Sequence, residues 1–187
     1  MHARLQELFA YLNVRRTALR EAVDLVPEAQ RNTRPDADRW SVAEVLEHLA
    51  LVEARFKTMI GDRLAEAKAA GLAREAETSA ITGTYNPAPM LDRSDKHQAP
   101  DVVVPKAAEW QAAWKKLDAV RQTFLDVYRA GEGLALGAVE MHHPRLGTMN
   151  LYQWGLWLGA HESRHTEQVR EIAADLTARD LSASAAE

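Results

Sequence analysis

Apolar residues recur at three- and four-residue spacing along four separate stretches of the chain, and this period constrains the fold more than any other feature. Such a stripe is typical of an amphipathic helix that packs one face against a core. No stretch alternates apolar and polar residues over a length that would indicate a strand. The pattern therefore predicts an all-α fold, and the four helices predict a four-helix bundle.

Local signals set the boundaries of the first two helices. The first stripe ends before Pro27, a residue that cannot continue a helix. The second begins at Ser41, where Ser41 and Glu44 have the spacing of a capping box. In that motif each side chain binds a backbone N–H that has no partner inside the helix. A helix is therefore expected from Ser41 onward.

The last two helices have similar signals. The third stripe follows Pro105, and Gly131 is expected to end it. The fourth begins near Asn150, which can form a reciprocal cap with Gln153, and runs to about Leu176.

The remaining segments are expected to be a connection and a tail. Residues 71–105 contain several glycines and prolines without a sustained period, which predicts a long connection between helices two and three. Connections of this length are uncommon in compact domains and often have a function. A chain of 187 residues fits one domain. We assign residues 1–176 to the bundle domain and 177–187 to a frayed tail.

Composition excludes several classes of function. The chain has 23 basic and 27 acidic residues, a net charge of -4 and no basic cluster, so nucleic acid is not an expected partner. There is no cysteine, which excludes disulfides and thiolate metal sites. The N-terminus lacks the apolar region of a signal peptide, and no apolar run reaches the roughly 18 residues of a membrane span. A cytoplasmic protein without a membrane partner is expected, and any metal ligand must be an imidazole or a carboxylate.

Two histidines lie inside the apolar stripe of the fourth helix. Each helical residue advances by about 100°, so His161 and His165 point toward the core one turn apart. Each buried ring nitrogen without a partner costs roughly 1–3 kcal/mol. A metal ion would bind one nitrogen of each ring. The alternative is that both are core histidines with ordinary hydrogen bonds.

His48, at the edge of the second stripe near Val52, is the best candidate for a third ligand. Three protein ligands and one open position are typical of a catalytic rather than a structural metal site. The other histidines fall at the terminus or in expected loops: His2, His97, His142 and His143.

Three stretches of the chain, at 40–53, 99–106 and 142–172, resemble the DinB/YfiT-like family of metal-binding four-helix bundles. The family pattern has a histidine in helix two, a His-Pro turn followed by glycine, and His-x-x-x-His with a preceding arginine and a following glutamine. The matching residues are His48, His143, Pro144, Gly147, His161, Arg164, His165 and Gln168.

The resemblance implies one divalent metal ion, zinc or nickel, on the three histidines, and a homodimer. It also implies a small-molecule substrate, either for transfer chemistry that uses a low-molecular-weight thiol or for hydrolysis. Two alternatives stay open, a bundle that binds a metal and a small ligand without chemistry, and a structural bundle with adventitious metal.

The sequence His161-Glu162-Ser163-Arg164-His165 also satisfies the H-E-x-x-H pattern of zinc proteases. In that case Glu162 would activate water as a general base. The chain offers no suitable third ligand downstream and no strand beside a substrate cleft, so the protease is a remote alternative. The preferred interpretation of Glu162 is an ordinary salt bridge or a hydrogen bond to a residue around the metal ligands, and the alternative is a catalytic general base.

Several residues near the histidines have two interpretations. Gln168 could hold a ring of the triad or lie at the surface, and Glu44 could orient His48 or serve only the helix cap. Arg164 is expected to point away from the histidines, and Trp157 to lie beside them.

The 71–105 connection is expected to help define a substrate pocket near the metal, and the alternative is that it packs outside the bundle. Apolar and polar contacts are expected from Tyr85, Met90, Leu91, Asp92, Arg93 and Asp95.

Overall fold

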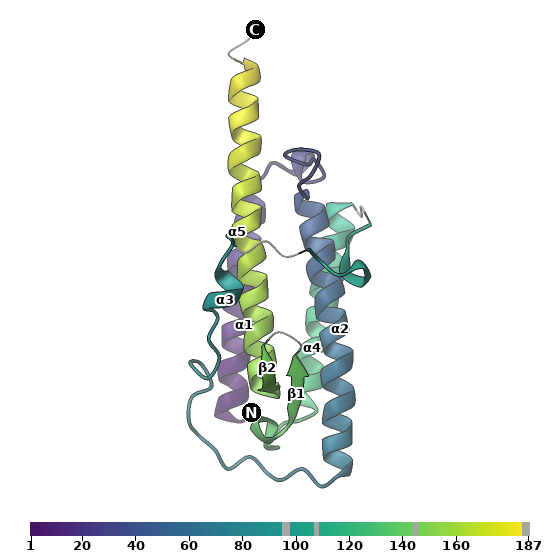
Figure 1. Ribbon diagram of the computed structural model, residues 1–187, viewed down its shortest axis with the longest axis vertical. Coiled ribbons are helices and arrows are strands. Elements are labelled where there is room, and N and C mark those ends of the chain that lie inside the picture. The colour runs from purple at the N-terminus through teal and green to yellow at the C-terminus, as the bar shows by residue number, and fades with distance from the viewer. Residues whose placement is uncertain (95–97, 107–108, 144–145, 185–187) are drawn as a thin grey trace.

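Four long helices form a bundle, as the apolar period predicts (Figure 1). A computed structural model describes residues 1–94, 98–106, 109–143 and 146–184. The long helices are α1 (Ala3–Asp24), α2 (Val42–Ala69), α4 (Trp110–Arg129) and α5 (Leu151–Ser184). The short elements are α3 (Ala88–Leu91), β1 (Glu140–His143), β2 (Gly147–Asn150) and the 3-10 turns η1 (Glu28–Gln30), η2 (Asp101–Val103) and η3 (Leu136–Ala138).

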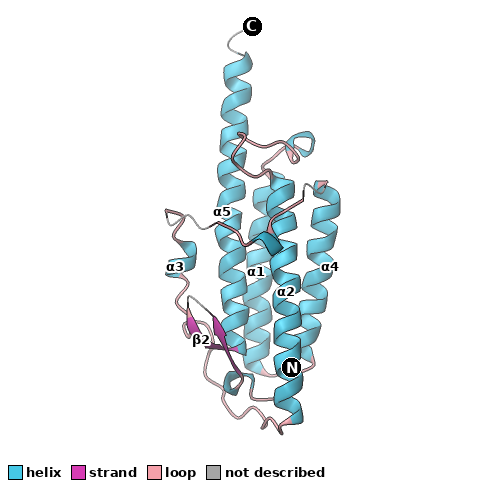
Figure 2. Cartoon of the chain, turned by 45° about the vertical axis from the view of Figure 1, so that its right-hand side comes forward, coloured by secondary structure: helices cyan, strands magenta, loops and turns pink. Residues whose placement is uncertain are grey.

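The order of the helices explains the long connection. Helices α1 and α5 run in one direction and pack against each other, while α2 and α4 pair and run in the opposite direction (Figure 1). Because α2 and α4 are parallel, the chain must return along the whole bundle between them. The connection does so on the outer side of α5, where it forms α3, before it crosses back to α2 (Figures 1 and 2).

Both predicted caps are present. The Ser41 hydroxyl accepts from Glu44 N at 3.2 Å, and the Glu44 carboxylate accepts from Ser41 N at 2.8 Å. Asn150 and Gln153 exchange the equivalent pair of bonds at 2.9 and 3.0 Å. The starts of α2 and α5 are therefore confirmed.

The prediction that the chain has no strand was wrong. Strands β1 and β2 pair antiparallel, with His142 opposite Thr148 and His143 opposite Gly147. These two histidines thus lie on a strand rather than in a loop, whereas Pro144 lies outside the described residues. Four-residue strands are too short to show an apolar alternation, and Gly147, with φ +78°, supports the tight return.

The expected end of the last helix near Leu176 was also wrong, because α5 continues to Ser184. Its last turns project beyond the bundle (Figure 2). Contacts with the segment before α2 hold part of this extension, since Arg179 Nη1 donates to the carbonyls of Arg34 and Pro35 at 3.3 and 2.9 Å. Residues 185–187 of the expected tail lie outside the described residues.

The apolar core has two parts, one toward the hairpin and one toward the start of α2. Between them each long helix contributes one buried charged side chain. These four residues, which we call the charged layer, are Arg16 of α1, Glu53 of α2, Arg121 of α4 and Glu162 of α5. Within the described part of the chain, no helix is both long and apolar enough to cross a membrane.

Candidate metal centre

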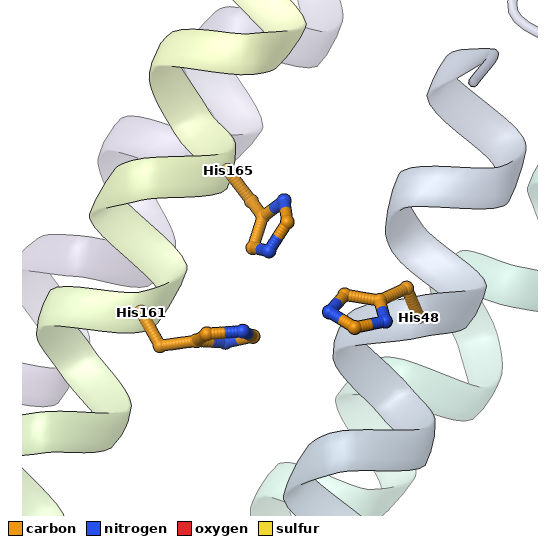
Figure 3. A group of neighbouring side chains, drawn as sticks. All are labelled: His48, His161 and His165. Carbon is orange, nitrogen blue, oxygen red and sulfur yellow. The ribbon is translucent and has the colours of Figure 1, made fainter. Parts of the chain in front are cut away.

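The three predicted histidines face one another across the gap between α2 and α5 (Figure 3). His48 comes from the second turn of α2, and His161 and His165 come from adjacent turns of α5. One nitrogen of each ring lies within 4.8 Å of the others, and all three residues are buried. An ion bound at about 2.0–2.1 Å from each nitrogen would draw these atoms to within about 4 Å of one another.

Hydrogen bonds fix which nitrogen two of these rings can offer. His48 Nδ1 lies 2.8 Å from the Val103 carbonyl, and His165 Nδ1 lies 2.7 Å from Gln168 Oε1. Both partners are acceptors, so each Nδ1 carries the proton and each Nε2 keeps its lone pair. Ligating histidines usually have such a partner on the second nitrogen.

Burial keeps the triad neutral. It lowers the pKa of His48, although the Val103 carbonyl opposes this shift. It also lowers the pKa of His165 to about 3, with a further contribution from His48, and holds the pKa of His161 well below its usual value. Neutral imidazole is the form that binds a metal, because a protonated ring has no free lone pair.

The donor set fits a divalent ion. Three neutral nitrogens leave the full charge of the ion uncompensated, which suits a site that polarises a further ligand. His161 Nδ1 is buried and has no hydrogen-bond partner among the described residues. An all-protein network would satisfy this atom, so the cluster is incomplete as a purely hydrogen-bonded core. The three-histidine cluster can therefore hold a metal ion.

Tryptophan rings flank the triad on two sides. Trp157 stacks on His161 with ring centroids 5.2 Å apart, which confirms that it lies beside the histidine face. Trp40, directly before the α2 cap, lies 5.0 Å from His48 and 6.5 Å from His165. The histidine cluster thus has aromatic neighbours on two sides.

Glu162 belongs to the charged layer rather than to the triad. Its Oε1 accepts from Arg16 Nε at 2.6 Å, and its Oε2 pairs with Arg121. Glu53 completes the layer, with Oε1 2.5 Å from Arg121 Nε and Oε2 3.3 Å from Arg16 Nη2. Burial opposes the charge of Arg121, but Glu162 and Glu53 raise its pKa, so the guanidinium stays charged. Of the two interpretations of Glu162, the ion pair is the one observed.

Other residues near the triad have structural roles. Glu44 serves the cap and pairs with Arg34, whereas His48 is held by Val103 instead. Arg164 points away from the triad, as expected, and its Nη1 donates to the Met90 carbonyl at 3.0 Å. Gln168 holds His165, which decides between its two interpretations.

The connection does not place its central residues beside the metal centre as expected. Tyr85 and Leu91 line a hollow on the opposite side of α5 from the histidines. Arg93 pairs with Glu171 of α5, and Asp92 offers its carbonyl to Arg164. The reason is the parallel course of α2 and α4, which leads the chain around the outside of α5 (Figure 1). Asp95 and His97 lie outside the described residues.

Two sets of residues at or near the site were missed in the sequence. Val103 acts through its backbone carbonyl, which leaves no sequence signal. The charged layer did leave one, because Arg16, Glu53 and Arg121 each interrupt an apolar stripe. A charged residue in a core position indicates a buried partner of opposite charge.

Comparison with known proteins agrees with this geometry. The chain is 26% identical over 148 residues to the uncharacterized protein YuaE of Bacillus subtilis (strain 168), across 75% of this chain and 82% of that protein. No solved structure is significantly similar to the chain. The family model of the DinB superfamily matches residues 11–169, which include all three histidines. With this match over most of its length, the chain belongs to the DinB superfamily.

Proposed function

We propose that this protein is a metal-dependent enzyme that acts on a small molecule with the help of one divalent ion, zinc or nickel, held by His48, His161 and His165. The observation that carries the proposal is the convergence of three buried, neutral imidazoles from two helices. When bound, the ion would lower the pKa of a water molecule or a thiol at its open position. Water would lead to hydrolysis, and a low-molecular-weight thiol to transfer of its sulfur to an electrophile.

The residues around the triad support this proposal. Val103 and Gln168 hold two of the rings in the orientation that leaves Nε2 free. Trp40 and Trp157 cover the rings and lower the local polarity. A thiol would have to come from a second substrate, because the chain contains no cysteine.

A zinc protease is disfavoured by the position of Glu162. A general base must lie within hydrogen-bond reach of the water that it activates. Here both oxygens of Glu162 are bound by Arg16 and Arg121. A non-enzymatic metal-binding bundle is the remaining alternative, and it predicts ligand binding without turnover.

The first prediction concerns the metal itself. Each of the variants His161→Ala and His165→Ala should lose stoichiometric zinc or nickel and yet stay helical, because the apolar core forms without the ion. Metal analysis of dialysed protein and circular dichroism measure the two properties. Unfolding of both variants would mean that the site is structural instead.

Activity is tested by incubating metal-loaded protein with low-molecular-weight thiols and electrophilic acceptors, and separately with hydrolysable esters and amides. The expected result is turnover in one of the two screens that disappears in His161→Ala. Substrate binding without turnover would favour the non-enzymatic alternative. The homodimer implied by the family resemblance is part of the proposal, and light scattering of the purified protein tests it.

A further inference from the structure

A hollow of about 590 Å³ lies between α1, α5 and residues 82–91 of the connection. Its α5 side includes Ala160, Ser163 and Thr166. Ser163 follows His161 by two residues, which turns its side chain by about 200° and places it on the opposite face of the helix. The hollow is therefore separate from the metal centre. Its volume is within the range of small-molecule sites, roughly 300–1,000 Å³.

The segment over this hollow is attached to both helices. The Glu7 carboxylate of α1 accepts from the backbone N–H groups of Ile81 and Thr82, each at 2.9 Å. From α5, Gln153 Nε2 donates to the Thr84 carbonyl at 2.7 Å. These bonds hold the segment in place independently of anything that lies beneath it.

Small side chains leave the space open. Ala18 of α1 and Ala160 and Ser163 of α5 lie where larger residues would fill the gap below the connection. The Ser163 hydroxyl donates to the Gly159 carbonyl at 3.0 Å and so stays close to its own helix. The hollow thus results from the choice of residues on both helices.

One cationic side chain in the hollow has no counter-charge. No carboxylate of the described residues forms an ion pair with Arg15, and its buried Nε has no hydrogen-bond partner among them. Its guanidinium lies 4.6 Å from the centre of the Tyr11 ring. The neighbouring Arg170, by contrast, pairs with Glu167. Arg15 therefore offers donors and a positive charge to whatever occupies the hollow.

The rest of the lining is mixed: Thr82, Thr166 and the paired Glu167 and Arg170 are polar, and the remaining large side chains are aromatic or aliphatic. Tyr11, Tyr85, Leu91 and Leu156 line the space. Burial raises the pKa of Tyr11 and raises that of Tyr85 to about 12, so both rings are uncharged at neutral pH. Aromatic faces favour flat ligands. Arg15, the described lining cation without a carboxylate partner, favours one negative charge.

We infer that this hollow binds a small amphipathic anion, in which a flat apolar body lies between the tyrosines and one carboxylate, sulfonate or phosphate group pairs with Arg15. The site lies on the back of the two turns that carry His161 and His165. It is independent of the proposed metal function and can be tested whether or not the protein binds metal.

The test uses 1-anilinonaphthalene-8-sulfonate as a probe, with fluorescence titration of the full chain. We expect saturation at one site per chain and at least tenfold weaker binding to Arg15→Gln, because a charge-assisted hydrogen bond is lost. The uncharged analogue N-phenyl-1-naphthylamine should bind both proteins equally. Equal affinity of wild type and Arg15→Gln for the sulfonate would overturn the inference.

Two further variants locate the site. Arg20→Gln is the matched control, since Arg20 also lies on α1 but pairs with Asp118 and stacks on Trp114 outside the hollow, and its affinity for the probe should equal that of wild type. Ser163→Phe should fill the hollow and abolish binding. If Ser163→Phe does not fold, the comparison of wild type with Arg15→Gln in affinity for the sulfonate is the deciding test. A change in particle mass with Ser163→Phe in light scattering would show that a second copy of the chain occupies the hollow, which would overturn the inference.

Discussion

Two rings of the histidine cluster, those of His48 and His165, are each held by a neighbour that is not itself a candidate ligand. Gln168 lies one turn after His165 on α5 and holds its Nδ1, while the backbone of Val103 does the same for His48. Such partners fix the ring orientation and the tautomer, and removing one typically weakens metal binding about 10- to 100-fold. The affinity of the cluster for a metal ion is therefore expected to depend on single hydrogen bonds.

Gln168→Leu should weaken metal binding about 10- to 100-fold while the protein stays folded, because the His165 ring can then rotate and present either nitrogen. Competition with a chromophoric chelator measures the affinity. Gln122→Leu makes the same change at an exposed position of α4 and serves as the control. Unchanged affinity in Gln168→Leu would show that packing alone orients His165.

At the scale of the element, the start of α2 positions His48. The capping box of Ser41 and Glu44 fixes the first turn, and Arg34 pairs with the same carboxylate from the preceding segment. Trp40 lies directly before the cap and covers His48. One short stretch of sequence therefore determines both where the helix begins and how the triad is covered on that side.

Ser41→Ala should lower the free energy of unfolding by about 1 kcal/mol, within a range of about 0.5–2, because the Glu44 N–H loses its acceptor in a buried place. Denaturant titration measures this change. Ser182→Ala, on the exposed end of α5, should cost less than about 0.5 kcal/mol, because its hydroxyl only bonds back to Ala178. Equal costs for the two variants would argue against the capping role.

At the scale of the whole molecule, the charged layer joins all four helices at one level of the bundle. Each arginine contacts both carboxylates, so a shift of one helix along its axis would separate several pairs. A buried ion pair adds little net stability relative to apolar packing, whereas an unpaired buried charge is costly. We expect the layer to fix the register of the helices more than it raises their stability.

Arg121→Met should lower the free energy of unfolding by about 3–5 kcal/mol, because Glu53 and Glu162 would then share only Arg16. The double variant Arg121→Met/Glu53→Leu keeps the balanced pair of Arg16 and Glu162 and should recover much of this loss. Denaturant titration of wild type and both variants measures this loss of stability and its recovery. A double variant less stable than the single one would contradict this account, and metal content should not change in either.

The sequence alone determined the four long helices, the starting caps of α2 and α5 and the three histidines of the cluster. These features depend on local rules, since the helical period puts His161 and His165 on one face and the capping signals mark where α2 and α5 begin. The charged layer also left a signal in the sequence, because its charged residues interrupt apolar stripes, although only Glu162 was singled out. Each of these features is encoded within a few turns of one helix.

Only the tertiary structure decided the partners that come from distant segments. The Val103 carbonyl meets His48 because the connection returns to α2, and backbone atoms carry no residue identity that a sequence could reveal. The connection follows the outside of α5 because α2 and α4 are parallel, a choice that no local pattern encodes (Figure 1). The short hairpin and the extra turns of α5 likewise depend on contacts with the rest of the fold, because short strands and helix ends have too little intrinsic preference to define themselves.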